Sequence, residues 1–132
     1  FMLGAQAVQI GTRFIVAKEC NVHQAYKDRV IQARDIDSEV TGRSTGHPVR
    51  SLRNQMTRKY QALEKEGAGF EELELLTLGA LRKAVVDGDV KNGTVMAGQI
   101  AGLIKKEQTC SEIIKELMDG MSNVIEHVRG EL

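Results

Sequence analysis

The stretch Gln9-Ile10-Gly11-Thr12 has the residue types and the order of a phosphate-binding turn. The apolar run 7–10 predicts a short buried strand, and a helix is predicted to begin just after Thr12. A glycine between strand and helix lets the backbone approach a ligand closely. The free amides at the start of the helix attract an anion, typically phosphate. On these residues alone, a tight turn that binds nothing explains the pattern equally well.

Met96 is a second candidate for contact with a ligand. It follows a turn-rich loop over residues 88–94 and precedes Ala97-Gly98. A methionine in this position either fills the core or forms a flexible, polarizable wall for an acyl chain. Met56 and Met121 lie on helical stripes, where we expect core packing.

The histidines and cysteines do not form a metal-binding pattern. His23 and His127 are predicted on helices with polar neighbours, in surface or capping roles, and we expect a structural role for His47. None is spaced with another His or Cys as a metal site requires. Cys20 and Cys110 lie far apart without a Cys-x-x-Cys, so we expect neither a zinc site nor a disulfide framework. A reduced, cytoplasmic setting fits this cysteine usage.

Composition excludes several classes of protein. The 132 residues suffice for one domain, and 18 basic side chains balance 18 acidic ones, which argues against a general nucleic-acid binder. Aromatic residues make up 4% with no Trp, which leaves little for stacking bases. Hydrophobic residues make up 42%, too many for a disordered chain. No apolar run reaches the ~18 residues of a membrane span, so we expect no membrane partner.

The charge is unevenly distributed despite the zero total. Residues 42–60 carry five basic side chains and no acidic one: Arg43, Arg50, Arg53, Arg58 and Lys59. This run is either a solvated helix face or a patch for an anionic ligand or an acidic carrier protein.

Most of the elements that would position these residues are predicted to be helical. Asn21 is expected to cap a helix with its apolar stripe at Tyr26, Val30 and Ala33. Residues 36–40 alternate as a weak strand or extended arm. A helix is predicted to begin at Pro48 and to end at Gly67, with its stripe at Val49, Leu52, Met56, Tyr60 and Leu63.

Four more helices are predicted towards the C-terminus. Two short ones cover residues 70–78 and 81–86, and a small-residue helix covers 96–104. In the last of these, Gly98-x-x-x-Gly102 allows close packing but is too general to imply a ligand. Thr109 and Glu112 form a capping box that opens the final helix. Its buried stripe is predicted at Ile113, Leu117, Met121, Val124 and Val128.

The predicted strand at residues 7–10 has no strong partner strand in the chain. A buried strand needs neighbours for its backbone groups, and only the weak segment 36–40 is available. The chain also opens with Phe1-Met2-Leu3-Gly4, without a start methionine or a signal peptide. We therefore expect a fragment of a larger α/β protein whose N-terminal half is missing.

Three stretches resemble the flavin-dependent enoyl-acyl carrier protein reductases of the nitronate monooxygenase (2-nitropropane dioxygenase) superfamily. Residues 1–14 look like the last barrel strand of these enzymes, and residues 46–50 with Asn54 fit the same group. Residues 88–90 and 93–103 form the third stretch. The similarity extends over essentially the whole chain. The first and third stretches together are specific for this group.

The resemblance implies the C-terminal part of a (β/α)8 TIM barrel with a mostly helical lid. Residues 1–33 would supply the last barrel strand and following helices, residues 34–95 the lid, and residues 96–132 the closing helices. The implied cofactors are FMN and NADH or NADPH. The implied reaction is reduction of a trans-2-enoyl thioester carried by acyl carrier protein, in fatty-acid elongation. A homodimer is also expected.

The resemblance also assigns residues to the site. Gln9, Ile10, Gly11 and Thr12 would bind the flavin phosphate, in agreement with the turn described above. Val95, Met96 and Ala97 would line the substrate side of the flavin. The family's catalytic histidine belongs to an earlier loop, so no catalytic residue is expected within this chain. Two alternatives stay open: a nitronate monooxygenase of the same fold, and a non-enzymatic helical interaction module.

Overall fold

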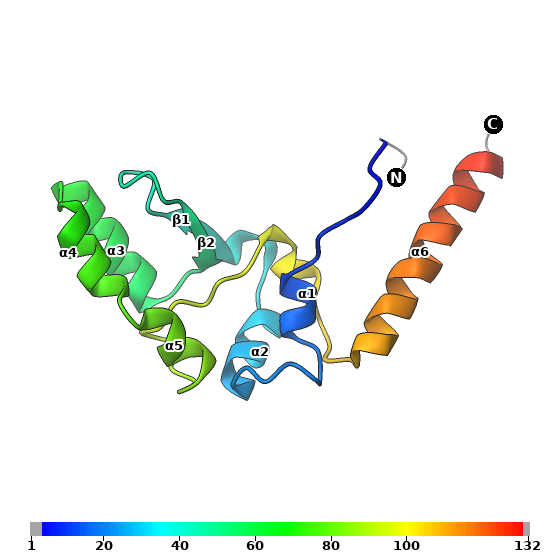
Figure 1. Ribbon diagram of the computed structural model, residues 1–132, viewed down its shortest axis with the longest axis horizontal. Helices are drawn as coiled ribbons and strands as arrows, with labels where there is room; N and C mark the ends of the chain where they lie inside the picture. The colour runs from blue at the N-terminus through cyan, green and yellow to red at the C-terminus, as the bar shows by residue number, and fades with distance from the viewer. Residues whose placement is uncertain (1–3, 131–132) are drawn as a thin grey trace.

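The computed structural model describes residues 4–130, so Phe1, Met2 and Leu3 of the resembling stretch and the final two residues lie outside it. The fold is mixed, with a small hairpin among helices (Figure 1). The elements in chain order are α1 (Thr12–Ile15), α2 (Gln24–Ile31), the 3-10 turn η1 (Asp35–Asp37), β1 (Ser38–Thr41), β2 (Val49–Leu52), α3 (Gln55–Glu66), α4 (Phe70–Thr77), α5 (Ala80–Val85), the 3-10 turn η2 (Gln99–Leu103) and α6 (Cys110–Gly130).

The predicted strand at residues 7–10 is not formed. The segment has no ladder partner among residues 4–130, and the side chain of Val8 is 63% exposed. In Figure 1 it runs away from the body of the molecule as a coil. A strand requires a neighbour for its amides and carbonyls, and the described residues provide none here. They therefore form no closed barrel.

The predicted helix start at Pro48 is wrong, because residues 49–52 form the second strand of a hairpin. Strands β1 and β2 pair antiparallel, with Ser38 opposite Leu52 and Thr41 opposite Val49. The chain reverses at Gly42, where φ is +80° and an added Cβ would lie 2.4 Å from the His47 carbonyl oxygen. The apolar residues Val49 and Leu52, read above as part of a helical stripe, instead lie three apart on a strand. Helix α3 begins only after Asn54.

The end of α3 and the ranges of α4 and α5 follow the prediction closely, whereas the cap of α2 differs. Helix α3 ends at Gly67, and α4 and α5 occupy the predicted ranges to within one residue. The cap of α2 is His23 rather than Asn21, since His23 Nδ1 accepts a hydrogen bond from the Ala25 amide at 3.1 Å. The capping role predicted for His23 is confirmed.

Two apolar clusters hold the molecule together. The main one joins α2, β2 and the segment after α5, and its buried members are Val16, Tyr26, Val30, Ala33, Leu52, Ala84, Val95, Ala97, Ala101 and Ile104. The second packs α3 against α4 through Met56, Tyr60 and Leu73. The stripe predicted for α2, Tyr26, Val30 and Ala33, is therefore confirmed as core. Of the stripe predicted for α3, Met56 and Tyr60 are core, Leu63 packs against them partly buried, and Val49 and Leu52 lie on β2 instead.

An extended segment, Thr94–Gly98, joins the two halves of the molecule, and we call it the central segment. The Leu52 amide donates to the Val95 carbonyl at 2.8 Å, and the Ala97 amide donates to the Arg50 carbonyl at 3.3 Å. The predicted helix at 96–104 is thus wrong in its first half, because β2 pairs with this segment instead. Only η2 is helical, and there Gly102 packs so tightly that a Cβ would lie 2.5 Å from the Asp35 amide nitrogen.

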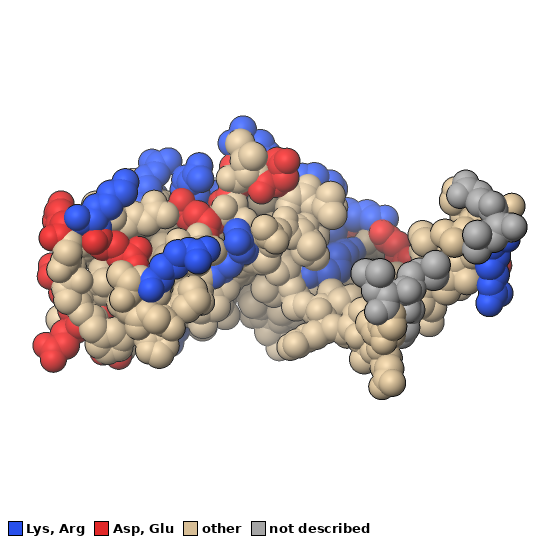
Figure 2. All heavy atoms as spheres, turned by 90° about the horizontal axis from the view of Figure 1, so that it is seen from above, with Lys and Arg blue, Asp and Glu red and all other residues tan. Residues whose placement is uncertain are grey.

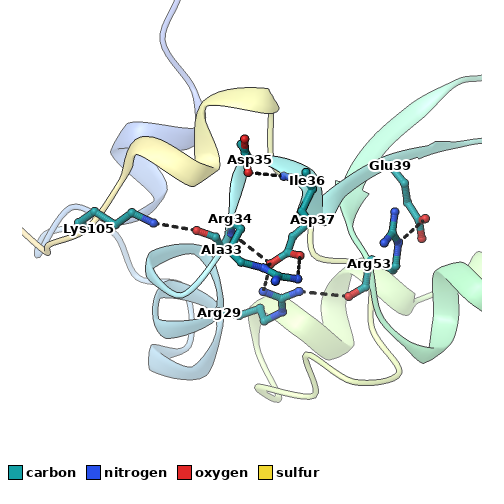
Figure 3. A network of polar contacts seen from close by, with 9 residues as sticks. All are labelled: Arg29, Ala33, Arg34, Asp35, Ile36, Asp37, Glu39, Arg53 and Lys105. Carbon is teal, nitrogen blue, oxygen red and sulfur yellow. Dashed lines mark hydrogen bonds and ion pairs between the residues drawn. The ribbon is translucent and has the colours of Figure 1, made fainter.

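Charged side chains connect α2 to the start of the hairpin (Figure 3). Arg34 Nη2 contacts Asp37 Oδ1 at 3.0 Å, and hydrogen bonds from Arg34 hold the pKa of Asp37 below its ordinary value. Arg29 donates to the Arg53 carbonyl at 3.2 Å, and Arg53 pairs with Glu39 at 3.0 Å. This network orients the hairpin against α2.

Helix α6 begins as predicted, but its apolar stripe is largely exposed. The Thr109 amide donates to Glu112 Oε2 at 2.7 Å, and the Glu112 amide donates to Thr109 Oγ1 at 3.2 Å, which confirms the capping box. Ile113 is buried, whereas Leu117 is 40% and Val124 is 57% exposed. The helix projects from the body, so residues 4–130 offer little surface to cover it (Figure 1). No described helix is long and apolar enough to cross a membrane.

Asn54 joins α3 to the loop before the central segment, so its loss should destabilise both. Its side-chain oxygen accepts from the Thr57 amide at 3.0 Å, and its Nδ2 donates to the Val90 and Gly93 carbonyls at 2.8 and 2.7 Å. We expect Asn54→Ala to lower the free energy of unfolding by about 2–3 kcal/mol, from one helix cap and two hydrogen bonds. Urea denaturation of the full-length polypeptide measures this.

The variant Asn54→Ser separates the two contributions. Serine caps a helix about as well as asparagine but cannot reach both carbonyls. The free energy of unfolding of Asn54→Ser should therefore exceed that of Asn54→Ala by the contribution of the cap, about 1 kcal/mol, and stay below that of the wild type. An Asn54→Ala protein as stable as the wild type would contradict this role.

Candidate functional site

The turn at Gly11 and Thr12 presents free backbone amides. The amides of Phe14 and Ile15 both donate to the Gly11 carbonyl, at 2.9 and 3.3 Å. The amides of Gly11, Thr12 and Arg13 therefore precede the first hydrogen bonds of α1, where helix amides lack intrahelical partners. This is the donor arrangement that a phosphate group needs.

Gly11 itself is explained by neither backbone strain nor packing. Its φ of −101° and ψ of −70° are accessible to any residue, and a Cβ added there would meet nothing within 4 Å. The glycine leaves open space directly beside the free amides. This space fits a ligand that approaches the backbone closely.

The other two residues of the predicted phosphate site lie in the preceding coil. Gln9 is exposed and Ile10 is partly buried. Both belong to the segment that lacks a ladder partner among the described residues. The structure therefore brings together Gly11 and Thr12 at the turn, but it leaves Gln9 and Ile10 outside any organised contact.

Thr12 connects this turn to the central segment. The Gly98 amide donates to Thr12 Oγ1 at 2.9 Å. The hydroxyl oxygen is thus an acceptor in this contact, and its hydrogen is free to be donated to a ligand. A Cβ on Gly98 would lie 3.4 Å from the same oxygen, so the two segments are close neighbours.

Arg13 adds positive charge next to the turn, which the sequence analysis did not single out. Its Nη2 donates to Gln108 Oε1, and its Nη1 is buried without a hydrogen-bond partner. Gln108 in turn donates to Glu116 Oε2 at 2.9 Å. The guanidinium is therefore held through Nη2, and Nη1 is a buried donor that no described residue satisfies.

The three residues predicted to line the substrate side do not share one environment. Val95 is fully buried and Ala97 is 4% exposed, both in the main apolar cluster. Met96 is 37% exposed and lines a cavity. Successive residues of an extended segment point to opposite sides, so Met96 faces away from the core that its neighbours fill.

The cavity next to Met96 has a volume of about 330 Å³ and lies between the hairpin and helices α3, α4 and α5. His47 and Phe70 meet there, with ring centroids 6.1 Å apart at a tilt of 57°. Its lining residues are Thr41, Gly42, Thr45, His47, Val49, Met56, Tyr60, Phe70, Leu73, Glu74, Thr77, Leu81, Thr94 and Met96. Sequence reasoning missed this cavity, because the stripe residues Met56 and Tyr60 indicate only that α3 has a buried face.

Tyr26 fixes the backbone of Met96. Its hydroxyl donates to the Met96 carbonyl at 2.7 Å. Burial raises the pKa of Tyr26 to about 12, so the phenol stays protonated and able to donate at neutral pH. The Met96 side chain therefore starts from a backbone position that a buried residue of α2 holds.

The basic run over residues 42–60 does not form a single helix face. Arg50 donates to Ser38 Oγ at 3.1 Å, and Arg53 pairs with Glu39. Arg43, Arg58 and Lys59 are exposed. Figure 2 shows Lys and Arg gathered along one edge of the molecule, interspersed with acidic side chains. Arg53 is exposed as well but is paired with Glu39, so a patch for an anionic partner would consist of Arg43, Arg58 and Lys59.

The amino-acid sequence matches one family model and is similar to several known proteins. The family model described as nitronate monooxygenase matches residues 1–120. A probable nitronate monooxygenase of Bacillus subtilis is 25% identical over 87% of this chain and 33% of its own length. A protein of Mycobacterium tuberculosis, (3aS,4S,5R,7aS)-5-hydroxy-7a-methyl-1-oxo-octahydro-1H-indene-4-carboxyl-CoA dehydrogenase, is 24% identical over 87% of this chain and 43% of its own length.

The solved structures include a similar fold. FabK from Thermotoga maritima is 40% identical and superposes with a TM-score of 0.93 over 99% of this chain and 42% of its own. The chain therefore spans between about a third and less than half of the length of these proteins.

The hydrogen bond from Tyr26 to Met96 should contribute measurably to stability. We expect Tyr26→Phe to lower the free energy of unfolding of the full-length polypeptide by about 1 kcal/mol, the net value of one hydrogen bond. Tyr60→Phe is the matched control, since Tyr60 is also buried, at 6% exposed against 2% for Tyr26, but no described residue accepts a hydrogen bond from it. Chemical denaturation compares the two variants.

The raised pKa of Tyr26 also fixes a pH window. A group whose pKa is higher in the folded state contributes stability that is lost as pH rises from its ordinary pKa, near 10, through the folded value of about 12. Wild-type protein should lose stability more steeply than Tyr26→Phe in that window. Parallel curves for the two proteins would contradict this.

Proposed function

The chain belongs to the nitronate monooxygenase family, and on this premise we propose that it is the C-terminal part of an FMN-dependent enoyl-acyl carrier protein reductase. The observation that carries the proposal is the similarity to FabK, at 40% identity over 99% of the chain. The cavity beside Met96 supports it, because an acyl thioester needs an apolar surface next to its reacting carbons. The carboxyl-CoA dehydrogenase relative also has a thioester in its name.

The turn at Gly11 and Thr12 fits the phosphate of FMN. The amides of Gly11, Thr12 and Arg13 and the Thr12 hydroxyl hydrogen supply neutral donors, and the Arg13 guanidinium supplies charge. Gln9 and Ile10 complete this site once residues outside this chain pair with their segment. FMN held by these residues would supply hydride transfer from NADH or NADPH to the β-carbon of the enoyl thioester, and a proton added at the α-carbon would complete the saturation.

The residues of this chain then bind and orient rather than move protons. The central segment holds Met96 through Tyr26 and β2, so its side chain is presented to the substrate from a fixed backbone. Val95 and Ala97 anchor the same segment in the core. The catalytic acid belongs to the part of the protein outside this chain.

Nitronate monooxygenase activity is the second candidate, favoured by the family model and by the name of the Bacillus relative. It would use the same phosphate site. It differs in the substrate, because a nitronate is small and polar and gains nothing from an apolar cavity. Oxygen would then replace the enoyl thioester as oxidant.

The partners follow from the proposed reaction. The substrate would arrive on acyl carrier protein, and the exposed Arg43, Arg58 and Lys59 offer charge for an acidic carrier. The exposed apolar face of α6 would be covered by the remaining barrel segment or in a homodimer.

Replacement of Gly11 tests the flavin site. The backbone angles suit an L-residue and an added Cβ meets no atom within 4 Å, so we expect Gly11→Val to fold, with its side chain in the space beside the amides. We expect the purified full-length protein to lose most of its bound FMN, measured as flavin absorbance per protein. Gly69→Val is the matched control, because it also enters open space at the start of a helix, α4, away from the turn. Normal flavin content in folded Gly11→Val would reject the site.

Shortening Met96 tests the choice between the two activities. Each methylene buried against an apolar wall contributes roughly 0.8 kcal/mol. Met96→Ala should therefore lower the rate of NADH- or NADPH-dependent reduction more for long enoyl thioesters than for crotonyl thioester. Flavin content should follow the wild type, since Gly11 and Thr12 are intact.

Oxygen uptake with a nitronate is followed in parallel. If the enzyme oxidises nitronates, the rates of the wild type and of Met96→Ala would not depend on the chain length of the substrate. Nitronate turnover with oxygen, without reduction of any enoyl thioester, would overturn the reductase assignment in favour of the second candidate.

A further inference from the structure

Two segments that are far apart in the sequence lie side by side at the start of helix α6. Ala17 and Gln108 form a parallel β-bridge, and the Lys18 amide donates to the Gln108 carbonyl at 2.9 Å. In Figure 1 the loop between α1 and α2 passes next to the first turn of α6. We call this contact between residues 17–20 and residues 107–110 the α6 junction.

A buried lysine holds the two segments of the α6 junction together. Lys27 is 4% exposed, and its Nζ donates to the Ala17 carbonyl at 2.7 Å and to Glu107 Oε1 at 2.9 Å. Hydrogen bonds from Lys27 and then from Gln24 lower the pKa of Glu107, so its carboxylate stays ionised at neutral pH. Separation of the segments would leave the buried ammonium without its partner, which is costly. The junction is therefore a fixed part of the fold.

The α6 junction brings the two cysteines of the chain close together, although they are 90 positions apart in the sequence. The Cys20 amide donates to the Ala17 carbonyl at 3.1 Å, and this turn keeps the two Cα atoms within about 7 Å. Cys110 lies two residues beyond Gln108, again at most about 7 Å away. Because the bridged segments run in the same direction, both cysteines lie on the same side of the bridge.

Glu19 connects the surroundings of the two thiols. It directly precedes Cys20, and its carboxylate oxygens accept hydrogen bonds from the Cys110 amide at 3.0 and 2.9 Å. Partial burial, the Glu19 carboxylate and the charge of Cys20 all raise the pKa of the Cys110 thiol. A charge shifts a pKa in this way only from nearby. Both thiols are free and partly exposed, so a small oxidant in solution can reach them.

We propose that Cys20 and Cys110 form a reversible disulfide that fixes the start of α6 against the loop after α1. The inference goes beyond the proposed function and does not depend on it. A disulfide requires Cα atoms within about 7 Å of each other, and bridged segments lie about 5 Å apart. In a reducing compartment such a bond forms only when an oxidant is present, so the pair would respond to the redox state.

The oxidant in this reaction is a small-molecule disulfide such as oxidised glutathione. One cysteine thiolate attacks it, forms a mixed disulfide and releases one glutathione thiolate. The second cysteine thiolate then attacks the protein sulfur of the mixed disulfide and releases the second glutathione. The two cysteines lose two electrons and two protons, and both are recovered in two molecules of glutathione thiol.

Peptide mapping of the full-length polypeptide tests the proposal. The protein is equilibrated with mixtures of reduced and oxidised glutathione, and its remaining free thiols are blocked. Trypsin, which cleaves after Lys and Arg, releases Cys20 on residues 19–27 and Cys110 on residues 107–115. We expect mass spectrometry to find these two peptides joined, in a yield that rises with oxidised glutathione and falls to zero after treatment with dithiothreitol.

A double variant is the matched control. Cys110→Ser combined with Ser122→Cys moves the thiol twelve positions along α6, about 18 Å, to an exposed position on the same helix. Cys20 should stay unlinked in this variant and in Cys110→Ser alone, and circular dichroism checks that both are folded. In the wild type, the disulfide closes a long loop and should raise the thermal midpoint by roughly 5–10 °C. Oxidised glutathione should leave the midpoint of both variants unchanged.

Three results would overturn the proposal. The first is a separate glutathione adduct on Cys20 and on Cys110 of the wild type without any joined peptide, which would show that the two thiols do not meet. The second is linkage of Cys20 in the control variant in the same yield as in the wild type. The third is a joined pair that leaves the thermal midpoint unchanged, because a bond of this kind would not fix α6.

Discussion

The central segment Thr94–Gly98 is the constraint on which the rest of the molecule depends. Its backbone is bonded on one side to β2 and at its end to the Thr12 hydroxyl, and Tyr26 holds it from α2. Its side chains alternate, so Val95 and Ala97 enter the main core while Met96 faces the cavity. One short extended segment therefore connects the hairpin, the core, the cavity and the turn at Gly11 and Thr12.

This arrangement couples two sites that have different chemistry. The turn at Gly11 and Thr12 offers amides and a hydroxyl, which suit an anion, whereas the cavity offers apolar surface and no lysine or arginine. Because Thr12 bonds directly to Gly98, the relative position of the two sites is set within a few residues of chain.

The two candidate reactions differ in what their substrates need from the apolar cavity. A nitronate requires no apolar extension, and a long enoyl thioester gains most of its binding from one. The exposed side chains of Phe70, Leu81 and Met96 line the cavity that helices α3, α4 and α5 form with the hairpin.

Local signals in the sequence determined much of the fold. The capping box at Thr109 and Glu112, the end of α3 at Gly67 and the stripe of Met56 and Tyr60 depend on nearby residues, and the structure has them where they were expected. The position of the unpaired amides could also be predicted from Gly11-Thr12 before a helix, because the first amides of any helix have no partner within it.

Only the tertiary structure decided which residues pair and which surfaces meet. Val49 and Leu52 fit a helical spacing, yet they form a strand because β1 and the central segment are available on either side to bond with it. Residues 7–10 have the composition of a strand but remain coil, and the stripe of α6 remains exposed, because residues 4–130 supply no neighbour for either. The cavity could not be predicted either. Its walls come from segments up to 55 positions apart, from Thr41 to Met96, and the spacing of residues in the sequence does not indicate such contacts.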